Sequence, residues 1–477
     1  MATPNSAKFS DAVLDAGWEV MHGDARSLPL PDASIDLICT SPPYWGQRSY
    51  RDGGEHYSGQ VGSEPTPQQY VDELVGMIDS EWRRVLKPSE SLWLNLGDKY
   101  AGSGGHNNAG VGAPKERGPS RYIQATEARP KSLLGLPERV KIALIDRGWI
   151  CRATVIWDKA NGLPESVTDR VRASHEYWYH FTLEPRYYAA VDRIREPLRT
   201  AYQGPDWQER KRRGEQANNR TEDGLTPFEG AHLDLASHPL GRLPGSVRSI
   251  ATQPFRIPDE VKARLNLPDH YAAFPMEWPR WIIEGWCPEK VCVVCGEGRR
   301  PVTAGTPMEW TPSGRQDGAE LVGQRRPTSG TMTKAPTATI VGEACACPDT
   351  TAPSTPGVVL DPFGGTGTTA GVAHILGRHG ISVDLSADYC RLAQWRIGES
   401  GQFEKWYEQF LADQAEAQLP GGPLVDLLCL LPGIGRKTAH AIIDSGIMPL
   451  RVNADLTNVA GVGRKTVGRI RNFLAGI

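Results

Sequence analysis

The sequence predicts an α/β fold: a doubly wound, mostly parallel sheet with a cysteine-containing insertion and a small all-α C-terminal domain. Three observations predict it. Short apolar runs alternate with amphipathic stretches over much of the 477 residues, as in sheets built from strand–helix–strand units. A glycine-rich turn joins one apolar run to the helix after it. Near the C-terminus, a pattern of two apolar helices joined by a glycine-containing turn occurs twice.

The alternation is clearest in the first half of the chain, residues 1–194. Two strands are predicted from the apolar runs there, and a helix follows with apolar residues at helical spacing and a stop before Pro88. Another strand, a second helix and two more strands come next. In chain order, the predicted elements are the strands 18–25 and 35–41, the helix 68–87, the strand 91–97, the helix 136–148 and the strands 150–157 and 176–183.

The second half of the predicted fold is discontinuous. It comprises residues 257–300 and 357–400, and the stretch "GVVLDPFGGTGTTAGVAHILGRHGISVDLS" reads as strand, glycine turn, helix and strand. Residues 195–256 have a weak pattern and are assigned to target recognition, while 287–348 form the cysteine-containing insertion. Residues 401–423 are predicted to be a linker with a helix, and 424–477 a separate module.

Composition limits the classes of function. The chain has 53 Lys and Arg against 56 Asp and Glu, so a nucleic-acid site must be a local patch rather than a global field. No signal peptide and no run of 18 apolar residues is seen, which predicts a cytoplasmic protein without membrane insertion. Nine cysteines in a chain of this length do not make a disulfide scaffold, but five of them lie between Cys287 and Cys347.

A rigid polar turn follows the second predicted strand, in the stretch "DLICTSPPYWGQRSY". Two consecutive prolines cannot continue a sheet or enter a helix, so Ser41, Pro42, Pro43 and Tyr44 are predicted to form a stiff loop at the strand's C-terminal edge. In an open α/β sheet, ligands bind at that edge. A proline turn with a packed tyrosine is the alternative when this string is taken alone.

The glycine turn "VVLDPFGGTGTTAG" predicts a ligand site at the start of a helix. Its glycines let a ligand approach the backbone, and a helix N-terminus favours an anionic group. The turn departs from G-x-G-x-x-G and lacks the lysine of a phosphate loop. Asp384 lies about 20 residues further on, where it can receive ribose hydroxyls. With Asp361 and Phe363, this pattern favours a cofactor that has an adenosine and an amino-acid tail.

The motifs "TSPPYW" and "DPFGGTGTT" together resemble those of the S-adenosylmethionine-dependent DNA amino-methyltransferases. Their order, with the cofactor motif about 320 residues after the catalytic one, is similar to the beta arrangement of that family. The resemblance covers most of residues 18–400. It includes "HGDA" at 22–25, "LKPSESLWLNLGDKY" at 86–100, "HEYWYHF" at 175–181, "ATQPFR" at 251–256 and the helix "AAFPMEWPRWII" at 272–283.

The resemblance implies methyl transfer to the exocyclic amine of a base flipped out of duplex DNA. Ser41 and the Pro42 carbonyl are expected to accept hydrogen bonds from the amine, and Tyr44 is expected to stack on the base. Positioning and electrostatics would carry the reaction, without a metal or a covalent nucleophile. Serine at the first motif position favours cytosine N4 over adenine N6. An inactive DNA-binding protein on the same fold is the other alternative.

The resemblance also implies how S-adenosylmethionine is held. Asp384 is expected to bind the ribose, Asp24 the adenine amino group, and Phe363 the apolar surface of the cofactor. The residues implied for the cofactor site are Asp24, Phe274, Pro275, Asp361, Pro362, Phe363, Gly364, Gly365, Thr366, Gly367, Thr368, Thr369 and Asp384.

The cysteine cluster predicts a structural zinc site. Cys292 and Cys295, followed by Gly296, are predicted to form a knuckle-like turn. Cys345 and Cys347 form a second pair. Four thiolates from two such turns can bind zinc tetrahedrally, with Cys287 as a fifth candidate. The 49 residues between the pairs must then loop out. Buried cysteines without a metal are the alternative.

The C-terminal module, residues 424–477, resembles a tandem helix-hairpin-helix domain. Each copy has a G-[IV]-G-R-K-T turn, in which backbone N–H groups at a helix start can bind phosphate. The module carries seven Lys or Arg and three Asp or Glu, which favours contacts with the DNA backbone. The residues concerned are Gly433, Gly435, Arg436, Lys437, Gly461, Gly463, Arg464 and Lys465.

Double-stranded DNA is therefore the expected partner, and association with the nucleoid is expected when DNA is bound. A second candidate phosphate patch is the cluster Arg210, Lys211, Arg212 and Arg213, for which a solvated helix face is the alternative. The sequence leaves open whether a cognate restriction endonuclease exists, which oligomer forms and which DNA site is recognised.

Overall fold

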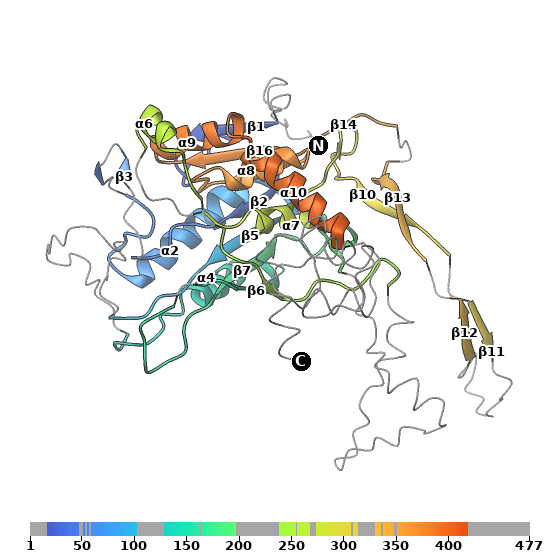
Figure 1. The fold of residues 1–477 in the computed structure, drawn as a ribbon, viewed down its shortest axis with the longest axis horizontal. Coiled ribbons are helices and arrows are strands. Elements are labelled where there is room, and N and C mark those ends of the chain that lie inside the picture. Colours follow the sequence, from blue (N-terminus) through green and yellow to red (C-terminus); the bar gives the residue numbers. More distant parts are fainter. Residues whose placement is uncertain are drawn as a thin grey trace, which may run out of the picture. The chain divides into compact units, whose positions relative to one another are not determined.

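An eight-stranded sheet forms the centre of the fold (Figure 1). Seven of its strands belong to two sets of parallel neighbours, and β7 runs antiparallel to the strand on each side of it. This arrangement confirms the predicted α/β class with a mostly parallel sheet. Across the sheet the order is β1 (Trp18–His22), β16 (His379–Asp384), β15 (Val358–Asp361), β2 (Ile35–Thr40), β5 (Leu86–Leu96), β7 (His175–Thr182), β6 (Ile150–Asp158) and β8 (Val247–Ser249).

The structure is a computed structural model, and the residues it describes span most of the sheet-bearing part of the chain. They are 17–46, 51–52, 55–56, 59–102, 128–162, 164–196, 238–253, 255–267, 273–306, 309–312, 330–334, 337–347 and 351–417. The predicted helical C-terminal module at 424–477 lies outside these ranges.

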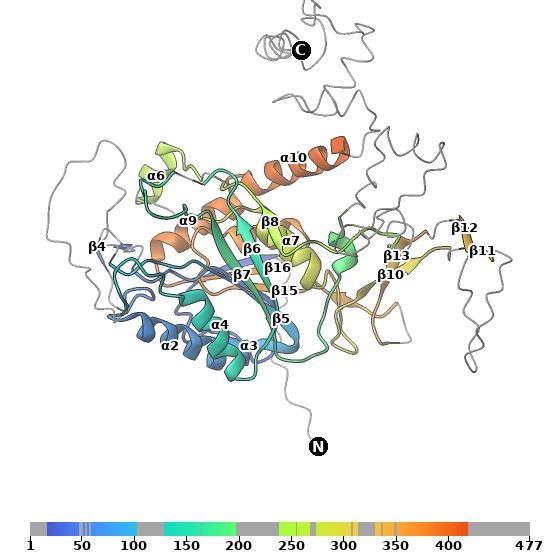
Figure 2. The same cartoon turned by 90° about the horizontal axis from the view of Figure 1, so that it is seen from below.

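Helices cover both faces of the sheet (Figure 2). On one face, α2 (Pro67–Met77) and α4 (Leu136–Asp146) bury apolar residues in a common core with β2 and β5. On the other face lie α7 (Glu277–Trp286) and α8 (Thr368–Ile375), which contact each other. The alternation of side chains along β5 explains the division: Leu92 and Leu94 face α2, whereas Trp93 points to the opposite side.

The α7 face is held by aromatic packing. The Trp93 ring lies 5.5 Å from that of Trp281 and 4.6 Å from that of Trp286, between ring centroids. Large buried aromatic rings remove much apolar surface from water and add favourable edge-to-face contacts. The resemblance implied a helix at 272–283 beside the cofactor pocket; the structure has α7 at Glu277–Trp286, and this packing anchors it to the centre of the sheet.

The predicted helix at 68–87 is interrupted. It begins with Thr66 as N-cap, whose side chain accepts a hydrogen bond from the Gln69 N–H, and α2 ends at Met77. A π-helical turn (Ile78–Trp82) and a short α3 (Arg83–Val85) follow. The chain then turns directly into β5 at Leu86, so Pro88 lies inside the strand rather than after the helix.

The insertion between α7 and β15 contains short antiparallel strand pairs. β9 (Val291–Cys292) pairs with β14 (Ser354–Thr355), which brings its two ends together. β10 (Arg300–Ala304) pairs with β13 (Thr339–Ala344), and β11 (Glu309–Pro312) pairs with β12 (Gly330–Lys334). The remaining elements are β3 (Arg51–Asp52), β4 (Glu55–His56), a 3-10 helix (Val191–Ile194), α6 (Asp259–Leu265), α9 (Ala387–Gly398) and α10 (Gln402–Ala417).

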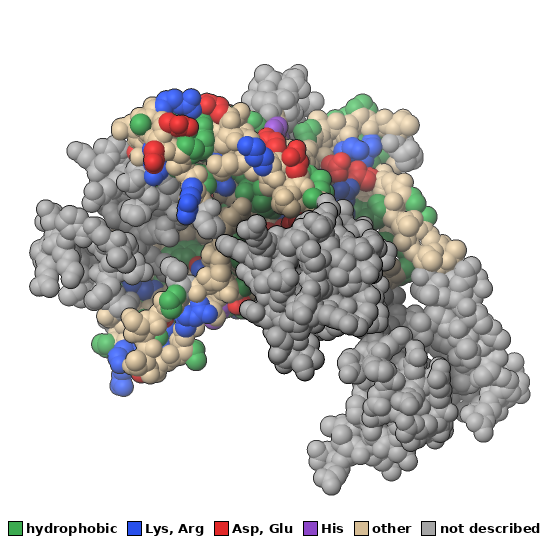
Figure 3. Space-filling model, in the orientation of Figure 1, with side chains coloured by type: hydrophobic (Ala, Val, Ile, Leu, Met, Phe, Trp, Pro, Cys, Tyr) green, Lys and Arg blue, Asp and Glu red, His purple; other side chains and the backbone are tan. Residues whose placement is uncertain are grey.

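The chain divides into two compact units, residues 1–399 and 400–477. In the first unit, β8 extends the sheet beside β6, so part of the segment 195–256 belongs to the sheet. Charges of both signs are interspersed over the described surface near α6 and α9 (Figure 3), in keeping with the balanced composition. Within the described ranges, no helix combines the length and apolarity needed to cross a membrane.

Candidate functional site

A cavity of about 420 Å³ opens at the carboxyl ends of the central parallel strands, and both sequence motifs line it. Ser41 follows β2, and Pro362 follows β15. The two strands are adjacent and parallel, with Leu360 beside Ile38, so these ends meet although they are far apart in the chain. We refer to the side formed by the turn after β15, Asp384 and Tyr389 as the glycine end. The side formed by Ser41, Tyr44, Asn95, Lys159 and Glu176 is the serine end.

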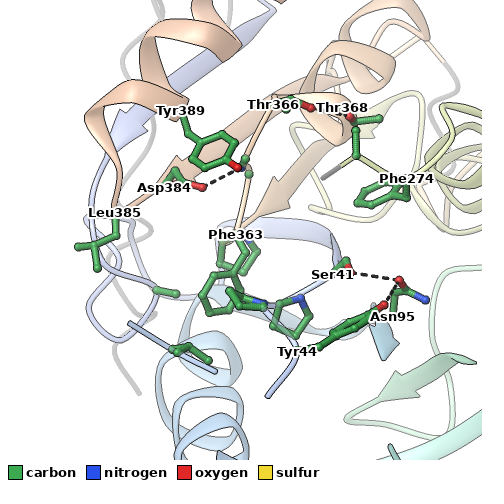
Figure 4. Close-up of a pocket in the computed structure, with 18 of the residues that line it drawn as sticks. Ser41, Tyr44, Asn95, Phe274, Phe363, Thr366, Thr368, Asp384, Leu385 and Tyr389 are labelled. Atoms are coloured by element: carbon green, nitrogen blue, oxygen red, sulfur yellow. Dashed lines mark hydrogen bonds between the residues drawn. The ribbon is translucent and has the colours of Figure 1, made fainter. Parts of the chain in front are cut away.

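Asp384, Tyr389, Thr366 and Thr368 lie at the glycine end (Figure 4), where backbone N–H groups make the main contacts with Asp384. Gly365 has φ +50° and Gly367 φ +72°, a conformation that disfavours other residues. A Cβ on Gly364 would lie 1.9 Å from the Ser382 Oγ, so only glycine lets the turn pack on β16. The Asp384 carboxylate faces the cavity, and the N–H groups of Gly365 and Ser386 donate to it at 2.8 Å each. These bonds fix the turn against the end of β16.

Apolar rings line the cavity between its two ends. Phe363 packs edge-on against Trp82, with 5.9 Å between ring centroids. Phe274 packs edge-on against Trp178 at 5.7 Å. Because each ring is supported from behind by a buried tryptophan, both present a fixed apolar surface to a ligand.

Asp361 lies under the cavity rather than in its wall. Its carboxylate accepts hydrogen bonds from the Thr40 hydroxyl (2.6 Å), the Thr369 hydroxyl (2.8 Å) and the Phe363 N–H (3.1 Å). Burial raises the pKa of Asp361 to about 6. The side chain therefore ties the end of β2, the turn and the start of α8 to one another.

Arg396 of α9 supports the glycine turn from below, and the sequence reasoning missed it. Its guanidinium donates to the hydroxyls of Thr366 and Thr368, at 2.7 Å each, and stacks over the Phe255 ring. Burial lowers the pKa of Arg396 to about 9. No motif in the sequence signals this contact, because an arginine in a helix is usually a surface residue.

The serine end is built from side chains. The hydroxyls of Ser41 and Tyr44 both lie within hydrogen-bonding distance of the Asn95 Oδ1, at 3.1 and 2.8 Å (Figure 4). The Asn95 Nδ2 donates to the Tyr177 carbonyl at 3.0 Å, so the amide oxygen is turned toward the cavity. A Cβ on Gly97 would lie 2.7 Å from the Tyr44 ring, which shows how closely that ring is held.

Glu176 and Lys159 complete the serine end. The Tyr44 hydroxyl lies 2.8 Å from the Glu176 Oε2, and the Lys159 ammonium forms an ion pair with the other carboxylate oxygen. Burial and the nearby carboxylate raise the pKa of Tyr44 well above its usual value. Sequence reasoning missed Asn95, Lys159 and Glu176 as site residues. Asn95 and Glu176 lie in stretches that carry the family resemblance, so those stretches held a signal for them.

Asp24 lies at the wall of the cavity and is paired. Its carboxylate accepts from the Arg26 guanidinium at 3.0 Å and from the Arg26 backbone N–H at 2.9 Å. Arg26 also forms an ion pair with Glu73 of α2. The carboxylate is thus oriented while its residue still lines the cavity.

The structure brings most of the predicted catalytic and cofactor-binding residues to this cavity. Four of the residues implied for the cofactor do not line it: Pro275, Asp361, Gly367 and Thr369. Thr369 is fully buried and donates to Asp361, and Gly367 caps α8. Asp361, Gly367 and Thr369 shape the turn instead of lining the cavity, and Pro275 accepts a hydrogen bond from the Trp278 N–H at the start of α7. The predicted DNA contacts at 210–213 and in 424–477 lie outside the described residues.

The four predicted zinc ligands form a separate cluster. The sulfur atoms of Cys292, Cys295, Cys345 and Cys347 all lie within 4.8 Å of one another. The Gly296 N–H donates to the Cys292 carbonyl at 2.9 Å, and Gly296 has φ +73°, so residues 292–296 form a tight knuckle. Backbone N–H groups of that knuckle lower the pKa of Cys292 to about 6. Cys287 is buried and lies outside the cluster.

Comparison with known proteins identifies the family. The DNA methylase model of N6 and N4 methyltransferases matches residues 35–294 and 350–395. The type II methyltransferase M.XycI of Xanthomonas campestris pv. cyanopsidis is 38% identical over 188 residues, which cover 38% of this chain and 59% of that protein. M.Cfr9I of Citrobacter freundii is 36% identical over 226 residues, covering 46% of this chain and 68% of the relative.

Solved structures were also compared with this chain. The PvuII DNA methyltransferase, described as cytosine-N4-specific, aligns with a TM-score of 0.43 and 16% identity over 82% of this chain and 90% of that one. The family match, in contrast, spans more than half of the chain and includes the strands that end at both motifs. This chain belongs to the N6 and N4 methyltransferase family of DNA methylases.

Proposed function

We propose that this chain transfers a methyl group from S-adenosylmethionine to the exocyclic amine of a flipped DNA base, with cytosine N4 favoured over adenine N6. The observation that carries the proposal is one cavity lined by two unlike ends. A glycine turn with a fixed carboxylate forms one end, and a cluster of hydrogen-bond acceptors forms the other. The order of the two motifs favours the beta arrangement of the family.

The residues of the glycine end fit S-adenosylmethionine. A Cβ on Gly365 would meet no atom closer than 3.8 Å, so bare backbone faces the cavity there. Asp384 offers acceptors for ribose hydroxyls, and Phe363 offers an apolar surface. Asp24 can accept from an amino group, and the start of α8 favours a carboxylate. When bound, S-adenosylmethionine supplies an electrophilic methyl group.

The serine end fits an aromatic amine. Such an amine is a weak nucleophile because its lone pair is delocalised into the ring. Acceptors that take both amine hydrogens favour a pyramidal nitrogen with a free lone pair, and they stabilise the charge that develops there. Ser41, the Pro42 carbonyl and Asn95 can supply these acceptors. The Tyr44 ring, fixed by its hydroxyl and by Gly97, can stack on the base.

Methylated nucleosides provide the direct test. The full-length protein should be expressed in a methylation-deficient host, and its DNA digested and analysed by mass spectrometry and modification-sensitive sequencing. N4-methylcytosine at one recurring site is expected. N6-methyladenine would overturn the base preference. DNA without either base, from cells with folded protein that binds S-adenosylmethionine, would support the inactive DNA-binding alternative.

We also propose that residues 424–477 bind the DNA backbone as a tandem helix-hairpin-helix domain. The support is the doubled G-[IV]-G-R-K-T motif and a local charge excess of four. Binding to every duplex should weaken by a similar factor when alanine replaces Arg436, Lys437, Arg464 and Lys465. Each lost phosphate contact should reduce the salt slope of binding by roughly 0.9. A change in the methylated site, or an unchanged slope, would contradict this role.

Zinc is proposed as a structural ion of the insertion. Four thiols this close cannot all ionise without a cation, and zinc would remove their mutual repulsion. Protein purified without chelator should contain about one zinc per chain, lost when Cys292 and Cys295 are both changed to serine. Cys151→Ser, outside the cluster, is the matched control. If the wild-type protein contains no zinc, the alternative of cysteines that bind no metal is supported.

The type II relatives favour a restriction–modification role for this chain in the cytoplasm, on nucleoid DNA. In such a system, a cognate endonuclease would cleave unmethylated copies of the site. Cells that express the methyltransferase should then survive expression of an endonuclease that cleaves the same site. Cleavage of the methylated DNA by every endonuclease specific for that site would contradict a protective role.

A further inference from the structure

The serine end contains an ion pair that methyl transfer, as proposed above, does not use. Lys159 directly follows β6, and Glu176 lies in β7 opposite Trp157. Both residues line the cavity, yet their side chains are only 24% and 15% exposed. A partly buried ion pair adds little stability on balance, because desolvation offsets the attraction. Because both residues line the cavity, a ligand bound there can contact the ion pair.

The lysine is fixed in place by three contacts. Its ammonium donates to the Glu176 Oε1 and lies 4.9 Å from the centre of the Trp157 ring. Its backbone N–H donates to the Ser174 carbonyl at 2.9 Å. Glu176 is in turn fixed by the Tyr44 hydroxyl at 2.8 Å. An ammonium has three donor hydrogens, so the bond to Glu176 leaves donors for a ligand.

The polar groups of the serine end are arranged in a sequence. Hydrogen bonds link Ser41 to Asn95, Asn95 to Tyr44, Tyr44 to Glu176 and Glu176 to Lys159. The acceptors Ser41 and Asn95 thus stand at one end of this chain of contacts, and the donor Lys159 stands at the other. The pairing edge of cytosine presents the amine N4, the acceptor N3 and the acceptor O2. Adenine presents the amine N6, the acceptor N1 and a C–H group. The donor Lys159 stands at the end of this chain of contacts that is away from the amine acceptors Ser41 and Asn95. It therefore matches the base acceptor furthest from the amine, which is O2 in cytosine. Adenine has no acceptor at that position.

We infer that Lys159 selects cytosine by donating a hydrogen bond to O2 of the flipped base, with Glu176 positioning the ammonium. This inference rests on the proposed function and deepens it. Among the described residues that line the cavity, the other cation is Arg26, which is held by Asp24 and Glu73. An adenine in the same place would leave the ammonium facing a C–H group, and unmatched buried donors discriminate strongly between substrates.

The first experiment compares Lys159→Met with wild-type enzyme on a duplex containing the identified site. kcat/KM for cytosine should fall roughly ten- to hundredfold, the range for loss of a charge-assisted hydrogen bond. The dissociation constant of S-adenosylmethionine and the unfolding temperature should hardly change. Lys159→Arg should restore part of the activity. Lys131→Met, which removes an exposed ion pair with Asp169, is the matched control and should be silent.

The second experiment changes the base. A duplex with 2-thiocytosine at the target position has a poorer acceptor in place of O2. Wild-type enzyme should lose activity on this duplex, whereas Lys159→Met should lose little more than it has already lost. Independent, multiplicative losses would show that Lys159 does not contact this atom.

The outcomes separate this inference from the proposed function. Cytosine methylation with wild-type rates in Lys159→Met would overturn the role of Lys159 alone. Adenine as the natural target would overturn the base preference and this inference together, but not methyl transfer. Absence of any methylation by cofactor-bound wild-type protein would overturn the proposed function itself. If Lys159→Met lowers the affinity for S-adenosylmethionine by the same factor as kcat/KM, the ion pair has only a structural role.

Discussion

The two ends of the cavity differ in what builds them. At the glycine end, the turn and Asp384 come from one stretch, residues 361–384, and backbone N–H groups make the main contacts. At the serine end, side chains arrive from four separate strand ends, at positions 41, 95, 159 and 176. The glycine end should therefore be sensitive to backbone changes, and the serine end to the loss of individual side chains.

Asp361 lies between the two ends. It is bonded to Thr40, just before the serine motif, and to the Phe363 N–H in the glycine turn. A single buried carboxylate thus sets the distance between the places proposed for the base and the cofactor. Because near-attack geometry is worth several orders of magnitude in rate, this spacing matters even though Asp361 does not line the cavity.

The largest effect is expected at the serine end. Tyr44→Ala should lower kcat for methyl transfer roughly a thousandfold, because it removes both the stacking ring and the partner of Asn95 and Glu176. Ser41→Ala should have a smaller effect in the same direction. Single-turnover assays at saturating S-adenosylmethionine measure both.

Tyr44→Phe is the matched control, since it keeps the ring and removes only the hydroxyl. It should retain more activity than Tyr44→Ala. Full methyl transfer by Tyr44→Ala would show that the serine end does not hold the base.

The next prediction concerns the pH dependence of stability at Asp361. Its pKa of about 6 in the folded state exceeds the ordinary value of 3.8. The folded protein therefore binds this proton more tightly than the unfolded chain does, so this contribution to stability is lost as pH rises from about 4 to about 6. The loss should be at most ~3 kcal/mol and constant above that window.

Urea unfolding of wild type and Asp361→Asn at pH 4, 5, 6 and 7 tests this prediction. The difference in unfolding free energy between the two proteins should change across the window and level off above pH 6. A difference that is the same at every pH would mean that Asp361 ionises with its ordinary pKa.

A smaller effect is expected at the glycine end. Asp384→Ala should raise the dissociation constant of S-adenosylmethionine at least tenfold, since hydrogen bonds to a charged group contribute about 1.5–3 kcal/mol. Asn95→Ala should instead lower kcat and leave this constant unchanged. Isothermal titration calorimetry measures both variants. Equal effects of the two on cofactor affinity would contradict the division of the cavity into two functional ends.

Several features of the protein follow from local chemistry and were predictable from the sequence. Prolines 42 and 43 must end a strand, and the glycines at 364, 365 and 367 permit a turn that other residues disfavour. Alternating apolar runs predicted the sheet, because strand and helix periods are intrinsic to the backbone. The paired cysteines signalled a cluster through their spacing alone.

Which distant residues share a surface depends instead on how the whole chain folds. Asn95, Lys159 and Glu176 meet because β5, β7 and β6 are neighbours in the sheet, and no local pattern specifies that order. Asp361 faces inward rather than into the cavity because β15 lies between β2 and β16, which brings its carboxylate to Thr40 of β2 and to Thr369 of α8. Strand order and side-chain direction follow from how the apolar faces pack together, which is a property of the whole core.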